Sequence, residues 1–154
     1  REENIPAFRT RMREIVRTDM GGEELVSTLQ IDGEIPNTAL LTLWGAAAGP
    51  VSVQAASVGG GSILVSRVNG MEVQFSGQYT TLIVLHKDAP GTIAAVTELL
   101  AAAGVNICNF RLARRQKGGA AVMTIETDGS FGAELNRAIG RLPNVLSSTL
   151  LPRM

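Results

Sequence analysis

The residues of this chain best suited to chemistry lie in one short loop and at the start of a later strand. The loop contains His86, Asp88, Pro90 and Gly91, and the strand opens near Asn106. If a helix follows the loop, its first backbone N–H groups are free and its positive end favours a carboxylate. Asp88 is an acceptor suited to an ammonium group, and Asn106 offers both a donor and an acceptor. We expect the start of that strand, with Asn106, to adjoin the loop, and a zwitterionic amino acid matches this set.

Each of these polar residues also has a purely structural interpretation. Asp88 stands two residues before Pro90, where it can cap the helix, and Asn106 can order the turn after Gly104. His86 is the one histidine of the sequence, and no serine, cysteine or carboxylate is recognisably paired with it. We therefore expect binding rather than catalysis, with no catalytic residue, no metal ligand, and a ligand-binding set of His86, Asp88, Pro90, Gly91 and Asn106.

Hydrophobic periodicity predicts the elements that must position this set. The pattern is strand, helix, strand, strand, helix, strand, a split βαβ repeat whose right-handed crossovers place both helices on one face of a four-stranded sheet. The loop then lies at the carboxyl end of the first strand. The predicted elements are a strand at Thr81–His86, a helix from near Pro90 to a left-handed cap at Gly104, strands from Val105 or Asn106 to about Arg115 and at Ala120–Glu126, a helix carrying Phe131, Leu135 and Ile139, and a strand at Val145–Leu151.

The preceding half of the chain reads mainly as strands separated by Gly and Pro. Asn69-Gly70 lies between two apolar runs and suits a type I′ hairpin turn. The best boundary between the two halves is Gly77-Gln78-Tyr79, so we expect domains at 1–77 and 80–154. The other predicted elements are an amphipathic helix at Pro6–Thr18 and strands at Thr38–Trp44, Val51–Ser57, Ser62–Val68 and Met71–Phe75.

The composition limits which binding partners and which cellular compartment we expect for this chain. The 14 basic and 14 acidic side chains cancel, so no global field draws the chain to nucleic acid or to anionic lipid. One cysteine, Cys108, excludes an internal disulfide and favours the cytoplasm. No apolar run approaches the roughly 20 residues that span a bilayer. The glycine run 59–61 lacks the Gly-Lys-Ser/Thr ending of a phosphate loop. We expect neither nucleic acid nor a membrane as partner.

Two sets of motifs resemble known families. The stretch 86–93, His-Lys-Asp-Ala-Pro-Gly-Thr-Ile, with Gly-Val-Asn-Ile at 104–107, resembles an ACT domain, the ligand-sensing module of many amino-acid enzymes. Further back, Ser-Val-Gly-Gly-Gly-Ser-Ile at 57–63, Val-Asn-Gly at 68–70 and Phe-Ser-Gly-Gln-Tyr at 75–79 resemble the β portion of bacterial iron–sulfur L-serine dehydratase. The resemblance implies an α+β fold, with a C-terminal ferredoxin-like βαββαβ ACT domain after part of an allosteric-substrate-binding-type α+β domain.

By this resemblance the holoenzyme converts L-serine to pyruvate and ammonia, using a [4Fe–4S] cluster in an α portion that would be the partner of this chain. This chain would be the regulatory half, without a cofactor of its own, and would form a homodimer that covers the open sheet face. In ACT domains of phosphoglycerate dehydrogenases, serine is held by a histidine and an asparagine of the first loop and an asparagine opening the second strand. The matching positions are His86, Asp88 and Asn106. The aspartate is a departure that leaves the effector open.

A second departure concerns the active site. The β portion of the family normally carries a Ser-Ser-Ser-His-Thr stretch, which this sequence lacks, so we expect the chain to be inactive alone and to be either a fragment or a divergent sensor. Two alternatives stay open. One is a regulatory fragment of a phosphoglycerate dehydrogenase, although no Gly-x-Gly-x-x-Gly fingerprint occurs here. The other is an ACT assembly module that pairs subunits without binding a small molecule.

Overall fold

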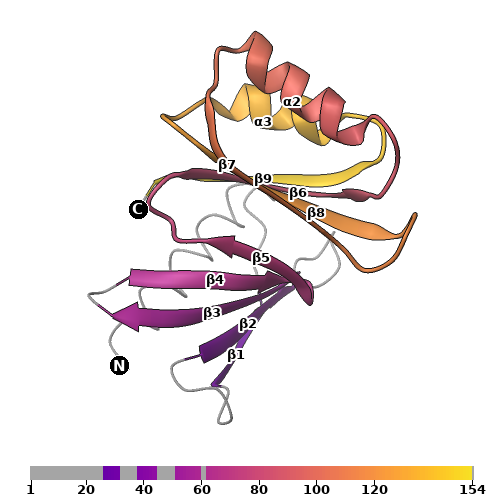
Figure 1. Ribbon diagram of the computed structural model, residues 1–154. Helices are drawn as coiled ribbons and strands as arrows, with labels where there is room; N and C mark the ends of the chain where they lie inside the picture. Colours follow the sequence, from indigo (N-terminus) through magenta and orange to yellow (C-terminus); the bar gives the residue numbers. More distant parts are fainter. Residues whose placement is uncertain (1–25, 32–37, 45–50, 60–61, 154) are drawn as a thin grey trace. The chain divides into compact units, whose positions relative to one another are not determined.

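The structure is a computed structural model that describes residues 26–31, 38–44, 51–59 and 62–153. The chain divides into two compact units, residues 1–76 and residues 77–154 (Figure 1). Each unit has its own sheet, so the two are described separately.

The first unit contains a five-stranded antiparallel sheet in which each strand pairs with the next along the chain. Four strands confirm the predicted ones. The strand Val26–Ile31 is not predicted above because its apolar residues follow no strict period of two. The predicted helix at 6–18 lies outside the described residues. The strands are β1 Val26–Ile31, β2 Thr38–Trp44, β3 Val51–Gly59, β4 Ser62–Val68 and β5 Met71–Phe75.

The hairpin between β4 and β5 has the predicted turn. Asn69 and Gly70 have φ values of 50° and 75°, as a type I′ turn requires. The Asn69 side chain also accepts a hydrogen bond from the backbone N–H of Ser52 at 2.9 Å, which ties the turn to β3. Along β5, buried and exposed residues alternate from Met71 to Phe75, so one face of this sheet is buried, as the sequence predicts.

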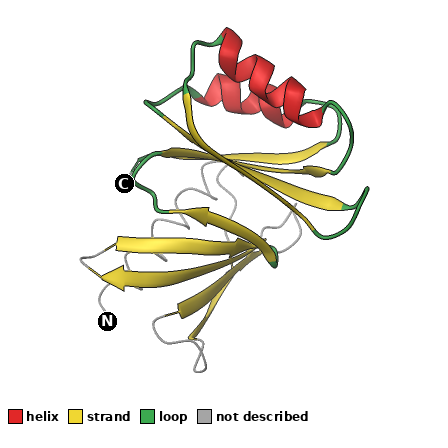
Figure 2. Cartoon of the chain, in the orientation of Figure 1, coloured by secondary structure: helices red, strands yellow, loops and turns green. Residues whose placement is uncertain are grey.

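The second unit has the predicted order of elements. Its sheet order is β7-β8-β6-β9, all antiparallel, and both helices cover one face of this sheet (Figure 2). The elements are β6 Thr80–Lys87, α2 Thr92–Ala102, β7 Ile107–Arg114, β8 Ala120–Thr127, α3 Ala133–Gly140 and β9 Val145–Leu151. Within the described residues, no helix combines the length and the apolar character needed to cross a membrane.

The core of this unit lies between the helices and the sheet. Alternate residues of β6 and β8 meet one face of each helix, because strand side chains repeat every two residues and helix side chains every three or four. Gly104 has a φ of 70° and follows the end of α2, as predicted. The fully buried cluster is Leu82, Val84, Val96, Leu100, Met123, Ile125 and Ile139.

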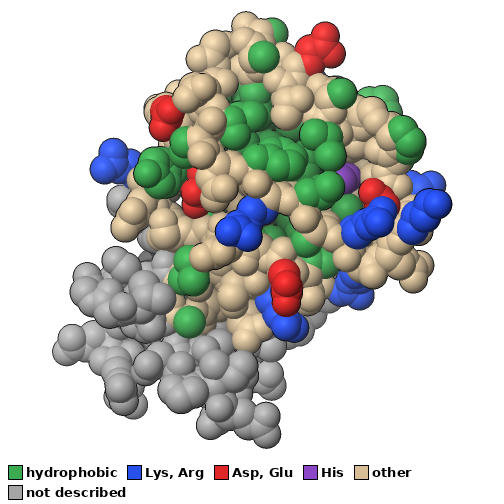
Figure 3. All heavy atoms as spheres, in the orientation of Figure 1, with side chains coloured by type: hydrophobic (Ala, Val, Ile, Leu, Met, Phe, Trp, Pro, Cys, Tyr) green, Lys and Arg blue, Asp and Glu red, His purple; other side chains and the backbone are tan. Residues whose placement is uncertain are grey.

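Among the described residues, this sheet ends at two edge strands, β7 and β9. Each carries an exposed leucine: Leu112 of β7 is 43% exposed and Leu146 of β9 is 73% exposed. Hydrophobic side chains are also visible on the surface of the helix-bearing unit (Figure 3). An uncovered edge strand offers backbone N–H and C=O groups to another chain, so both edges are candidate contact surfaces.

Candidate functional site

His86 ends the buried part of β6, on the side of the sheet that faces the helices. Its side chain is 2% exposed. Nδ1 lies 2.9 Å from the carbonyl oxygen of Lys87, and because a carbonyl can only accept, Nδ1 carries the proton. In the neutral imidazole Nε2 has a free lone pair, and this buried atom has no hydrogen-bond partner within the described part of the chain. A buried acceptor without a partner is costly, which makes it a candidate ligand contact.

Asp88 fixes the loop to the hairpin between β7 and β8. Its Oδ2 accepts hydrogen bonds from Nη1 of Arg114 at 2.8 Å and from the backbone N–H of Gly118 at 3.0 Å. Its own backbone N–H donates to the carbonyl of Gly119 at 2.8 Å. The N-cap interpretation of Asp88 is therefore wrong, because its side chain bonds to the hairpin. The Gly118 N–H, followed by Arg114, holds the pKa of this carboxyl below its usual range.

Pro90 and Gly91 form the exposed turn that leads into α2. Gly91 is the N-cap residue, with a φ of 83°, and no side chain caps the helix. The helix begins at Thr92 rather than near Pro90, and the Thr92 hydroxyl donates to the carbonyl of Ala89 at 3.1 Å. The Thr92 N–H donates to the carbonyl of Ala89 at 3.5 Å. The next first-turn N–H groups have no side-chain cap and are donors that a carboxylate would use.

Asn106 does not adjoin this loop, contrary to the expectation from the sequence. It precedes Ile107, which pairs with Thr127, whereas the loop follows Lys87, which pairs with Ala120. The two positions therefore lie at opposite ends of the sheet, separated by the length of β6, roughly 25 Å at about 3.3 Å per residue. One chain cannot hold one small amino acid between them.

At its own end of the sheet, Asn106 pairs with Asp128. Nδ2 of Asn106 donates to Oδ2 of Asp128 at 2.6 Å, and the backbone N–H of Asp128 donates to the carbonyl of Asn106 at 3.0 Å. This pairing favours the turn-ordering interpretation of Asn106, but both side chains remain exposed. Asn106 is therefore still accessible to a ligand or to another copy of the chain.

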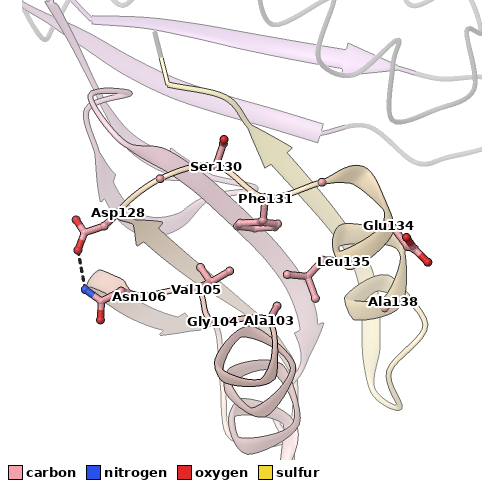
Figure 4. Close-up of a pocket in the computed structure, with 12 residues that line it drawn as sticks. Ala103, Gly104, Val105, Asn106, Asp128, Ser130, Phe131, Glu134, Leu135 and Ala138 are labelled. Atoms are coloured by element: carbon pink, nitrogen blue, oxygen red, sulfur yellow. Dashed lines mark hydrogen bonds between the residues drawn. The ribbon is translucent and has the colours of Figure 1, made fainter.

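The Asn106–Asp128 pair lies at the rim of an open pocket of about 660 Å³. The pocket lies between the end of α2 and the start of α3, and Phe131, Val105 and Leu135 point toward its centre (Figure 4). Its ionisable lining side chains are Asp128 and Glu134. This pocket and the loop at His86 are separate features, one at each end of the sheet.

The sequence did not single out Asp128, the Gly118 N–H or a site role for Arg114. The distance of 26 residues between Arg114 and Asp88 hides the contact, which depends on the pairing of β8 with both β6 and β7. The sequence feature that could have indicated this contact is the charge of Asp88, because an aspartate in a binding loop needs a cationic or N–H partner.

Cys108 lies exposed in β7. Partial desolvation, followed by the carboxylates of Asp128 and Glu126, raises the pKa of its thiol above the usual value. The thiol therefore stays protonated at neutral pH, which disfavours it as a nucleophile.

The geometry agrees with the family comparisons. The ACT domain model matches residues 80–144, and the helix-bearing unit is an ACT domain with a ferredoxin-like α+β fold. The chain is 35% identical over 114 residues to the probable L-serine dehydratase beta chain of Bacillus subtilis, which is 74% of this chain and 51% of that protein. It is also 28% identical over 83 residues to the L-serine dehydratase beta chain of Peptoniphilus asaccharolyticus, or 54% of this chain and 37% of the relative. The resemblance to L-serine dehydratase beta chains is confirmed.

A second group of relatives shares a smaller part. The chain is 33% identical over 82 residues to the D-3-phosphoglycerate dehydrogenase of Methanocaldococcus jannaschii, which is 53% of this chain and 16% of that enzyme. The chain thus spans about half the length of the Bacillus relative and less of the other two.

The residues of this chain do not fit an iron–sulfur cluster. Such a cluster is usually held by three or four thiolates, and the sequence has one cysteine. In the described ranges, no group of three or more His, Cys, Asp or Glu side chains could hold a metal ion.

Proposed function

We propose that this chain is the regulatory, amino-acid-sensing part of an iron–sulfur L-serine dehydratase. The observation that carries the proposal is the loop between β6 and α2, which combines the partnerless Nε2 of buried His86, the uncapped start of α2 and the carboxylate of Asp88. One loop thus provides a hydrogen-bond acceptor, backbone N–H donors and a carboxylate, which are the groups that a small hydroxylated zwitterion needs.

L-Serine matches this loop chemically. Its carboxylate suits the free N–H groups at the start of α2. Its ammonium suits the Asp88 carboxylate, and its hydroxyl can donate to Nε2 of His86. Because Nε2 is buried, a ligand reaches it only after the atoms that cover it move, so binding would reorganise the surroundings of His86.

In a homodimer, Asn106, the remaining residue of the predicted ligand-binding set, can come from the second copy of the chain. Two copies of the edge strand β7, paired antiparallel about a two-fold axis at its centre, place Ile107 of one copy opposite Arg114 of the other. Arg114 already bonds to Asp88 in its own chain. The pairing therefore brings Asn106 of the second copy toward the loop that holds Asp88, and we propose that the effector binds between the two copies.

The rest of the proposal comes from the family. The partner would be the α portion of the dehydratase, which would hold the [4Fe–4S] cluster, and the compartment would be the reducing cytoplasm. Residues 1–77 would belong to the allosteric-substrate-binding type of domain, ahead of the ACT domain at 80–154.

An assembly module is the second candidate, favoured by the exposed Leu112 on the free edge strand β7. Such a module would pair subunits through this edge and would ignore amino acids. The two candidates thus differ in ligand response rather than in oligomeric state.

Thermal unfolding with a panel of amino acids tests the proposal. L-Serine at about 100 times Kd should add about 2.7 kcal/mol to the free energy of unfolding, which corresponds to a rise in Tm of roughly 5–11 °C for a chain of this size. D-Serine should give a much smaller rise, because it cannot present its carboxylate, ammonium and hydroxyl to the three loop groups in the same arrangement as L-serine.

Three variants localise the response. Asp88→Ala and Asn106→Ala should abolish the rise in Tm. Thr97→Ala is the control and should keep the rise, since the Thr97 hydroxyl bonds only within α2, to the carbonyls of Ile93 and Ala94 at 2.9 and 3.2 Å. A Tm that no amino acid changes would favour the assembly module.

A further inference from the structure

The contact between Arg114 and Asp88 carries an inference about ligand selectivity. The loop position filled by Asp88 places a charged acceptor where a neutral amide would both donate and accept. Arg114 and the Gly118 N–H both bond to Oδ2. No hydrogen bond to Oδ1 occurs among the described residues, and the Asp88 side chain is 22% exposed. One carboxylate oxygen is therefore held by two donors, and the other has no hydrogen-bond donor among the described residues.

We infer that Arg114 is a positioning residue, which holds Oδ2 of Asp88 so that Oδ1 accepts the ammonium of the effector and makes a free amino group a requirement for binding. The inference rests on the proposed function, because it assigns a role within the same loop. The ligand class is a small α-amino acid with an unmodified amino group, and the corresponding hydroxy acid is excluded.

Electrostatics support this assignment. The groups acting on the Asp88 carboxylate are the Gly118 N–H of the hairpin, Arg114 of β7 and His86 of β6, and the first turn of α2 carries no acidic side chain. Together they lower the pKa of Asp88 below its usual value, against the opposing effect of desolvation, so the carboxylate is ionised at neutral pH. An ionised acceptor is what a cationic amino group requires.

Arg114→Gln tests the inference through the ratio of two affinities measured by calorimetry. The ligands are L-serine and L-glycerate, which carries a hydroxyl in place of the amino group. The native chain should prefer L-serine strongly. Arg114→Gln should bind L-serine about fivefold more weakly, the scale of an exposed ion pair, and should lose part of that preference. Arg114→Lys should restore much of it, and Asp88→Asn should remove it.

The loss of L-serine binding at low pH, here called the acid limb, gives a second readout. Binding requires ionised Asp88, so it is lost as the pH falls through the pKa of this group in the folded chain. Without Arg114 that pKa rises toward its ordinary value, so Arg114→Gln should lose binding at a higher pH than the native chain. A variant that perturbed only the fold would not move this limb.

Arg67→Gln is the matched control. Arg67 is as exposed as Arg114, 51% against 53%, and it faces Glu72 at 3.8 Å in the first unit. It should leave both affinities unchanged. If Arg114→Gln keeps the native affinity ratio and acid limb while L-serine still binds, the inference is wrong and the proposed function stands. If the native chain binds no amino acid, both are wrong.

Discussion

Leu112→Glu should convert the proposed dimer into monomers and remove the proposed response to L-serine in the same step. In the proposed pairing of two β7 strands, Leu112 is covered by the second copy, because it lies near the centre of the edge and is 43% exposed in one chain. Burying a carboxylate without a partner costs several kcal/mol. The dimer dissociation constant should therefore rise at least about 100-fold, as measured by sedimentation at several concentrations.

Leu146→Glu separates the two edges of the sheet. Leu146 lies on β9, the opposite edge, and is 73% exposed. The same substitution there should leave both the dimer and the L-serine response intact. A dimer that survives Leu112→Glu but dissociates with Leu146→Glu would place the contact on β9 and contradict the proposed site.

His86→Leu should weaken L-serine binding about tenfold without loss of stability. The ligand would lose its hydrogen bond to Nε2, worth about 0.5–1.5 kcal/mol. The folded chain would lose the bond from Nδ1 to Lys87, but it would also lose a buried acceptor without a partner, which costs about 1–3 kcal/mol. The free energy of unfolding should therefore stay within about 1 kcal/mol of the native value or rise.

His86→Gln provides the comparison for this variant. The amide of glutamine extends about as far as Nε2 and can accept a hydrogen bond, so this variant should keep part of the affinity that leucine loses. Urea unfolding gives the stability and calorimetry gives the affinity. If His86→Leu binds L-serine like the native chain, His86 is a structural residue and the ligand contacts lie elsewhere in the loop.

Many elements of the two units could be predicted because their signals are local. The apolar spacing of Val96 and Leu100, the left-handed Gly104 and the Asn69-Gly70 turn each depend on a few neighbouring residues. The strand Val26–Ile31 was missed for the opposite reason. This strand is stabilised by its pairing with Thr38–Trp44, and its own residue pattern does not indicate that pairing.

The site could be predicted only in part. His86, Asp88 and Gly91 share one loop, and sequence proximity was enough to group them. Asn106 was placed wrongly, because a helix of 11 residues carries the chain back along the sheet before β7 begins. The bond between Asp88 and Arg114 depends on strand register, which periodicity alone does not fix.

The most direct test of a site shared between two copies is to mix two variants that each fail to bind L-serine. Asn106→Ala and Asp88→Ala should each fail to bind L-serine alone. In a mixed dimer, one of the two sites combines the intact loop of one copy with the intact Asn106 of the other. After exchange of subunits, calorimetry should recover about a quarter of the native binding capacity, because half of the dimers are mixed and each has one intact site of two. Recovery of no binding, or native binding by either variant alone, would contradict a site shared between two copies.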